Sequence, residues 1–212
     1  MTTFIPALTL PSAVFETPAV AVLLPVVAGT GIGFSLRTET ASLYKKLKQP
    51  PGGPPAYLFG PVWTLLYAGM GYASYRAWSA GMSSPDPAKA ALAKVASLPP
   101  SLPHCSARDP TNINCLATQQ GATLYTVQLG LNLIWTPLFF GLGRPIEAIA
   151  DIVALNGVVG YLAYTWNQVD QTSAWLLVPY MAWLSFATYL SIGFGYLNNW
   201  SFKNIDKSDK SE

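Results

Sequence analysis

Residues 50–78 read PPGGPPAYLFGPVWTLLYAGMGYASYRAW, and they are the most informative segment of the chain. It begins with two pairs of prolines and continues with an uncharged, aromatic-rich run at residues 56–75. Proline is unfavourable inside a helix, but it is tolerated in the first turn or just before it. A helix needs about 20 mostly apolar residues to cross the hydrocarbon core of a bilayer. The stretch therefore predicts a loop that leads directly into a membrane-spanning helix.

The rest of the chain repeats this pattern. Of its 212 residues, 51% are hydrophobic and only 10% are charged, whereas an ordinary soluble domain is about 25% charged. Four further uncharged runs are each long enough for one span. We therefore predict an all-α integral membrane protein in the lipid bilayer, a single domain over residues 1–212 that forms a bundle of five transmembrane helices. The predicted spans are residues 18–36, 57–78, 121–141, 147–167 and 173–197.

Positive charges are divided unevenly between the two ends of the predicted bundle. Eight Lys and Arg residues fall in the first loop, the third loop and the C-terminal tail, and four fall on the other side. Because cytoplasmic loops collect Lys and Arg, we expect the first loop and the C-terminus to face the cytosol. The formal net charge is only +2, so the composition does not favour a nucleic-acid partner.

The loop predicted at residues 79–120 is rich in Pro, Ser and Ala. It contains the single histidine, His104, and both cysteines, Cys105 and Cys115. On the non-cytosolic side these cysteines can form a disulfide, and two free thiols in a polar loop are the alternative. One histidine and two cysteines without a CxxC spacing do not indicate a metal site, so no metal ligand is predicted.

Aromatic and polar side chains within the spans indicate a ligand cavity. Trp63, Trp135 and Trp183 come from three different spans, Asn132 lies on the same helix face as Trp135, and Ala187 marks a small-residue groove. Packing between helices is the alternative explanation, since small residues and single amides often serve that role in membranes. The combination favours a cavity for a flat, apolar ligand with a few polar groups. No catalytic residue is predicted, because a single histidine excludes most nucleophile–base arrangements.

Three collinear blocks carry a resemblance to a known family. They read GPVWTLLYAGMGYASY at residues 60–75, LYTVQLGLNLIWTPLFFG at residues 124–141 and SAWLLVPYMAWLSFATYL at residues 173–190. In these blocks the chain resembles the translocator protein family, also called tryptophan-rich sensory proteins or peripheral-type benzodiazepine receptors. The likeness covers about residues 44–200 and is interrupted by the long second loop.

The resemblance implies a five-helix bundle, usually a homodimer, with a ligand cavity that the first loop closes. Family members bind porphyrins such as protoporphyrin IX or haem, and many bind sterols and isoquinoline- or benzodiazepine-type drugs, with no required cofactor. Eukaryotic members usually reside in the mitochondrial outer membrane with a cytosolic C-terminus. The ligand positions that the family motifs imply are Tyr44, Tyr57, Trp63, Asn132, Trp135, Asp151, Trp183 and Ala187.

Two departures from the family pattern bear on the ligand. Residues 49–55 read QPPGGPP and lack the Lys and Trp that the family usually carries in this loop, so the lid contact made by that Trp is not expected here. The family's sterol motif requires a basic residue within five positions of its tyrosine, but six residues separate Tyr196 from Lys203. Such motifs are weak in any case. Porphyrin therefore ranks above sterol as the expected ligand.

The sequence leaves three functions open. The first is a receptor or transporter for porphyrin-like ligands, and transport is not distinguished from sensing. The second is light-dependent porphyrin breakdown, which the resemblance to some bacterial members implies for Trp63 and Trp183. The third is a ligand-free membrane scaffold that associates through the small residues Gly29 and Gly33.

Overall fold

The computed structural model describes residues 4–83, 113–200 and 202. The regular structure of this part of the chain is all helical and contains no strand, which confirms the predicted fold class at that level. Its elements, in chain order, are η1 (Pro6–Leu8), α1 (Ser12–Glu16), α2 (Pro18–Ser35), α3 (Arg37–Lys46), η2 (Ala56–Leu58), α4 (Phe59–Ser83), α6 (Ile113–Thr136), η3 (Pro137–Gly141), α7 (Pro145–Asn167) and α8 (Gln171–Leu197).

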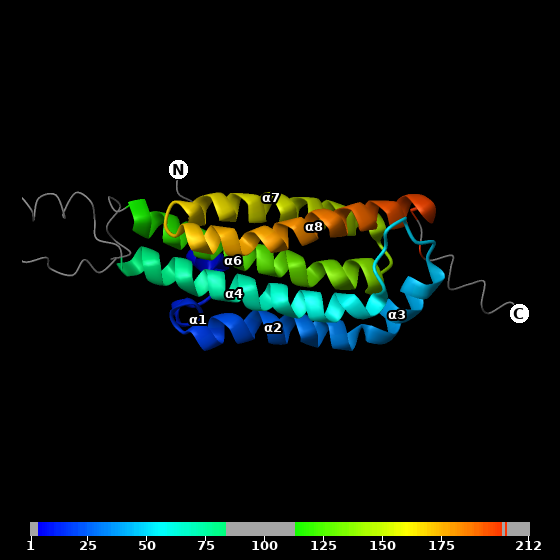
Figure 1. The fold of residues 1–212 in the computed structure, drawn as a ribbon, viewed down its shortest axis with the longest axis horizontal. Coiled ribbons are helices and arrows are strands. Elements are labelled where there is room, and N and C mark those ends of the chain that lie inside the picture. The colour runs from blue at the N-terminus through cyan, green and yellow to red at the C-terminus, as the bar shows by residue number, and fades with distance from the viewer. Residues whose placement is uncertain (1–3, 84–112, 201, 203–212) are drawn as a thin grey trace, which may run out of the picture.

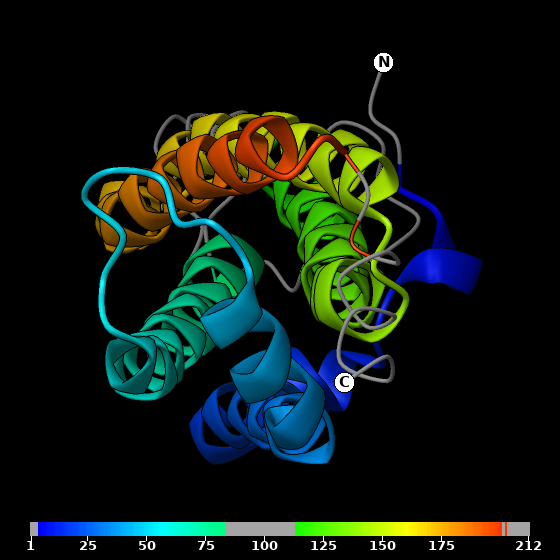
Figure 2. The same ribbon diagram turned by 90° about the vertical axis from the view of Figure 1, so that its right-hand side faces the viewer.

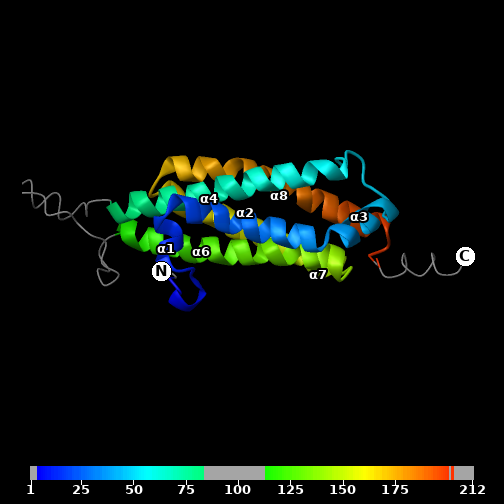
Figure 3. The same cartoon turned by 90° about the horizontal axis from the view of Figure 1, so that it is seen from below.

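The long helices α2, α4, α6, α7 and α8 run side by side along one axis (Figures 1 and 3). Seen from one end they form a ring in the order α2, α4, α8, α7 and α6 (Figure 2). The ring closes because α6 also contacts α2. We call the end that carries α3, the α6–α7 connection and the end of α8 the loop end. We call the opposite end, with α1 and the turn between α7 and α8, the far end (Figure 1).

The bundle has apolar side chains on its outside and polar side chains inside, as expected for helices surrounded by lipid. Three helices, α2, α7 and α8, are long and apolar enough to cross a membrane. Large apolar side chains face outward, since Val27, Leu65 and Trp175 are 65%, 73% and 65% exposed. Amides such as Gln128 and Asn132 face inward and are buried, which places the costly polar groups away from lipid. The helices α4 and α6 have 25 and 24 residues, a length that falls between those of α2 and α8, and they contribute most of these inward polar groups.

Prolines and one aspartate determine where several helices begin and end. Pro18 and Pro145 occupy the first helical positions of α2 and α7, where the missing N–H has no intrahelical partner to lose. Asp170 caps α8 by accepting a hydrogen bond from the Ser173 backbone N–H at 3.1 Å. Pro137 begins the wider turn of η3, a π-helical segment, because proline cannot donate the regular helical hydrogen bond.

The structure moves the boundaries of the second predicted loop inward. α4 continues to Ser83, and α6 begins at Ile113, inside the expected loop of residues 79–120. The first turns of α6 are polar in sequence but buried in the fold, and Gln120 Nε2 donates to Tyr161 Oη on α7 at 2.7 Å. Amide side chains that are hydrogen-bonded in this way can be buried between helices. His104 and Cys105 lie outside the described residues, whereas Cys115 is buried in α6.

The N-terminal segment packs against the far end of the bundle. Phe15 of α1 is 1% exposed and lies between the rings of Trp78 and Tyr125, at centroid distances of 5.2 and 5.8 Å. The backbone N–H of Leu10 donates to Thr126 Oγ1 on α6 at 3.0 Å. The hydroxyls of Thr9 and Thr123 lie 2.7 Å apart. These contacts attach the N-terminal segment to α4 and α6 at the far end of the bundle.

Candidate ligand site

A buried polar network joins α4, α6 and α8 near the middle of the bundle. Tyr67 Oη donates to Asn132 Oδ1 at 2.7 Å, and Asn132 Nδ2 donates to Tyr180 Oη at 2.9 Å. Tyr180 Oη in turn donates to Gln128 Oε1 at 3.0 Å, and Gln128 Nε2 reaches the sulfur of Met70 at 3.4 Å. Such fully connected networks specify one arrangement of their helices, because an unmade hydrogen bond in an apolar interior is costly.

Trp63 lies beside this network. Its ring contacts Tyr67 at a centroid distance of 5.5 Å and Tyr180 at 6.4 Å. Gly29 of α2 also packs against the Tyr67 ring, so closely that a Cβ at position 29 would overlap the ring. Gly29 therefore lets α2 pack directly against the tyrosine, whereas a Cβ on Gly33 would meet only open space.

A second aromatic group extends toward the loop end and contains three of the predicted ligand residues. Neighbouring rings in it have centroid separations of 5.2 to 6.1 Å. In order of contact the rings are Trp183, Phe59, Tyr44, Phe194, Phe139 and Trp135. Elements α3, α4, α6, η3 and α8 therefore meet in one series of aromatic contacts.

Buried polar atoms without a hydrogen-bond partner occur at three predicted ligand positions. They are Nε1 of Trp135, Nε1 of Trp183 and Oδ2 of Asp151. Leaving such a group unpaired costs about 1–3 kcal/mol, so native structures usually supply a partner. The two indole N–H groups can donate to a carbonyl or carboxylate, and the Asp151 oxygen can accept from an N–H.

The segment between α3 and α4 crosses the loop end and is attached to α8. Asn198 makes two hydrogen bonds to the backbone of Lys48, accepting from its N–H at 3.0 Å and donating to its carbonyl at 3.1 Å. Tyr189 Oη donates to the Pro51 carbonyl at 3.0 Å. Pro50 packs against Gly193, where an added Cβ would come within 2.7 Å of the proline ring. The loop that lacks the family's Lys and Trp thus has its own contacts with the bundle (Figure 2).

Tyr44 ties α3 to this loop. Its side chain is buried, and its Oη donates to the Pro54 carbonyl at 2.6 Å. Burial raises the pKa of Tyr44 above its ordinary value, so the phenol keeps its proton and remains a donor at neutral pH.

The predicted ligand residues do not all lie together. Ala187 is buried in the apolar core with Trp63 and Trp135 packed against the same cluster. Tyr57 is 75% exposed and is not part of that cluster. Tyr67 and Tyr180 are not among the ligand residues predicted from the sequence. Helical spacing could have found both, since Tyr67 follows Trp63 by four residues and Tyr180 precedes Trp183 by three.

An ion pair fixes α4 to the start of α8 at the far end. Arg76 Nε donates to Asp170 Oδ2 at 3.1 Å, and Arg76 Nη2 donates to Oδ1 at 3.2 Å. Burial disfavours the charged form of Asp170, but the hydrogen bonds from Arg76 and Ser173 outweigh it and hold the pKa of this carboxyl below its ordinary value. The carboxylate is therefore charged at neutral pH. In the described residues, no group of three or more His, Cys, Asp and Glu side chains could hold a metal ion.

Comparison with known proteins agrees with the motif blocks. Residues 21–197 match the model of the TspO/MBR family. The Translocator protein homolog of Schizosaccharomyces pombe is 40% identical over 83% of this chain and 88% of its own length. The Translocator protein of Bos taurus is 33% identical over 80% of this chain and 82% of its own, and the Tryptophan-rich protein TspO of Archaeoglobus fulgidus is 32% identical over 82% and 94%. The chain therefore belongs to the TspO/MBR family.

Proposed function

We propose that this protein binds a flat, largely apolar ligand of the porphyrin class among its aromatic side chains, as a membrane receptor or transporter. The observation that carries the proposal is the set of unpaired polar atoms on Trp135, Trp183 and Asp151. A porphyrin offers a complementary set of groups, since its carboxylates accept from indole N–H groups and its pyrrole N–H groups donate to a carboxylate. Its apolar macrocycle matches rings that already contact one another.

The proposal places the ligand beside the polar network of Tyr67, Asn132 and Tyr180. Each of these side chains is held by hydrogen bonds within the protein. They therefore act as a rigid wall, and the unpaired groups provide the specific contacts. A preformed wall of this kind reduces the ordering cost of binding.

The same proposal assigns five membrane-spanning helices, with α4 and α6 added to α2, α7 and α8. Both added helices are long enough to cross a bilayer and direct their polar groups inward. Arg37, Lys45, Lys46, Lys48 and Arg144 lie at the loop end, which supports a cytosolic position for that end. From what the family resemblance implies, we further propose a homodimer in the mitochondrial outer membrane, and sterols as a second ligand class.

A larger side chain at position 187 tests the proposed ligand site. Ala187→Leu adds volume to a buried position in α8, whereas Ala182→Leu adds the same volume at an exposed position of the same helix. We expect Ala187→Leu to weaken protoporphyrin IX binding at least tenfold and Ala182→Leu to leave it unchanged. Helix content and elution volume check that both variants fold. Equal affinities in folded Ala187→Leu and wild type would show that the ligand binds elsewhere.

A further inference from the structure

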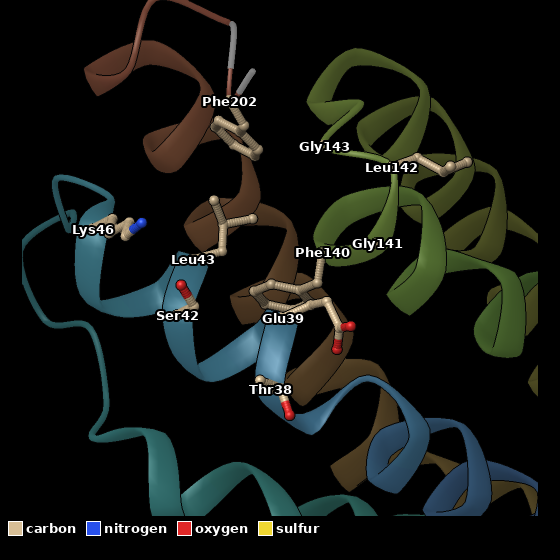
Figure 4. A pocket seen from close by; sticks show the side chains of 10 residues that line it. All are labelled: Thr38, Glu39, Ser42, Leu43, Lys46, Phe140, Gly141, Leu142, Gly143 and Phe202. Carbon is tan, nitrogen blue, oxygen red and sulfur yellow. The ribbon is translucent and has the colours of Figure 1, made fainter. Parts of the chain in front are cut away.

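A pocket of about 340 Å³ opens at the loop end, outside the aromatic site described above. It lies between α3 and the connection from α6 to α7 (Figure 4). Its volume is at the lower end of the range of about 300–1,000 Å³ that is usual for small-molecule sites. The lining side chains that matter for the argument are Thr38, Glu39, Ser42, Lys46, Phe140 and Phe202.

The backbone explains why a hollow remains here. Gly143 turns the chain with φ at +60°, a conformation that favours glycine. Gly141 and Gly143 bring no side chains into the gap between the turn and α3. Phe202 closes one side, and its Cβ lies 3.4 Å from where a Cβ on Gly143 would be.

One face of α3 gives the pocket charges of both signs. Thr38, Ser42 and Lys46 are spaced four residues apart and so lie along one side of the helix, with Glu39 next to Thr38. Glu39 and Lys46 are seven residues apart, which is about 10 Å along the helix axis. The acid in the first turn and the base in the last turn also suit the helix dipole. The dipole, however, does not explain why Thr38 and Ser42 also line the pocket.

The pocket lies beside the ends of two membrane-length apolar helices. The apolar helix α2 ends at Ser35, just before α3, and α7 begins at Pro145, just after the turn. Around the pocket, Phe34, Leu142 and Ile146 are 67%, 58% and 61% exposed. Apolar side chains so exposed at the end of membrane-length helices suit contact with acyl chains.

We propose that this pocket binds the headgroup of a zwitterionic phospholipid. Glu39 receives the ammonium group, and the ring of Phe140, which lies next to Glu39 in Figure 4, is its cation–π partner. Lys46 binds the phosphate as a point charge. The acyl chains leave over Leu142 toward the exposed apolar surface. This inference does not depend on the porphyrin site.

Lipid retention measured by native mass spectrometry tests the proposal. The full-length protein, in detergent, is mixed with equal amounts of phosphatidylethanolamine, phosphatidylcholine and phosphatidylglycerol. We expect wild type to retain the two zwitterionic lipids at least threefold more than the anionic lipid. Glu39→Gln and Lys46→Gln should each lower that retention at least threefold. Matched controls are Glu16→Gln at the far end and Lys45→Gln, which does not line the pocket.

Two further experiments complete the test. The first distinguishes binding in the pocket from attraction to general surface charge, and the second distinguishes a lipid ligand from a soluble zwitterion. Ser42→Leu fills the hollow without changing charge and should lower retention, whereas Ala41→Leu, outside the pocket, should not. Soluble phosphoethanolamine should compete only at concentrations at least a hundredfold higher than the lipid, because it lacks the acyl contacts. Competition at equal concentration would overturn the assignment to a lipid. Preference for the anionic lipid, or equal retention in all variants, would overturn the headgroup site.

Discussion

At the residue scale, Gly29 shows how one missing side chain positions the candidate site. It lies against the ring of Tyr67, whose Oη donates to Asn132 and so begins the polar network. A methyl group there would overlap the ring, and the ring has little room to move because Trp63 contacts it as well. The close contact of α2 with α4 is therefore a condition for the geometry of the network.

Gly29→Ala is expected to destabilise the protein by about 1–3 kcal/mol, the usual cost of overpacking a core. It should also weaken porphyrin binding, since Tyr67 must shift. The matched control is Gly33→Ala on the same helix, where a methyl group has open space. Thermal unfolding in detergent, followed by intrinsic fluorescence, measures the stability difference. Equal melting temperatures for the two variants would contradict the packing described for Tyr67.

At the element scale, α8 holds both ends of the bundle together. Near its C-terminus Asn198 binds the backbone of Lys48, and before its N-terminus Asp170 binds Arg76 of α4. Asn198→Ala removes the two hydrogen bonds that Asn198 makes to Lys48 in the loop that crosses the loop end, and leaves the bond from Tyr189 to Pro51 in place. We expect faster ligand dissociation and faster amide hydrogen exchange at the loop residues between 48 and 55 that carry an amide N–H, which are Lys48, Gln49, Gly52 and Gly53. Exchange at residues 171–176 serves as the internal control, and unchanged exchange in the loop would show that Pro50 and Tyr189 alone hold it.

The Arg76–Asp170 pair predicts an acid-sensitive contact at the far end. Because the folded protein lowers the pKa of Asp170, this pair stabilises the fold above the ordinary carboxyl pKa of about 4. That stabilisation is lost as the pH falls through the lower, folded value. Asp170→Asn keeps a helix-capping side chain but removes the charge. We expect its melting temperature to be below that of wild type at pH 7 and the difference to shrink toward pH 3. A difference that stays constant with pH would contradict the ion pair's role.

At the scale of the whole molecule, the sequence predicted the parts that depend on composition and spacing. Uncharged runs gave the all-helical class, and the motif blocks around Trp63, Asn132 and Trp183 gave the family. The sequence-based prediction placed the start of α6 too far along the chain. Thr118, Gln119 and Gln120 resemble loop residues in the sequence, but the fold buries them.

Other features of the fold depend on contacts that no local pattern contains. Phe15 packs between Trp78 and Tyr125, which are more than 60 residues away in the chain. The Asn198–Lys48 contact joins positions 150 residues apart. Tyr180 becomes part of the network only when α4, α6 and α8 meet.

The central claim is that the unpaired groups on the aromatic site bind a porphyrin, and one titration tests it most directly. Protoporphyrin IX is added in the dark to purified protein while tryptophan fluorescence is followed, with inner-filter effects corrected against an unrelated membrane protein. Wild type is compared with Trp183→Phe, which removes a buried unpaired N–H, and with Trp175→Phe, which removes a 65% exposed ring from the same helix. We predict saturable quenching in wild type and Trp175→Phe, and at least tenfold weaker binding in Trp183→Phe. Linear quenching that is the same in all three proteins would mean simple partitioning and would contradict the claim.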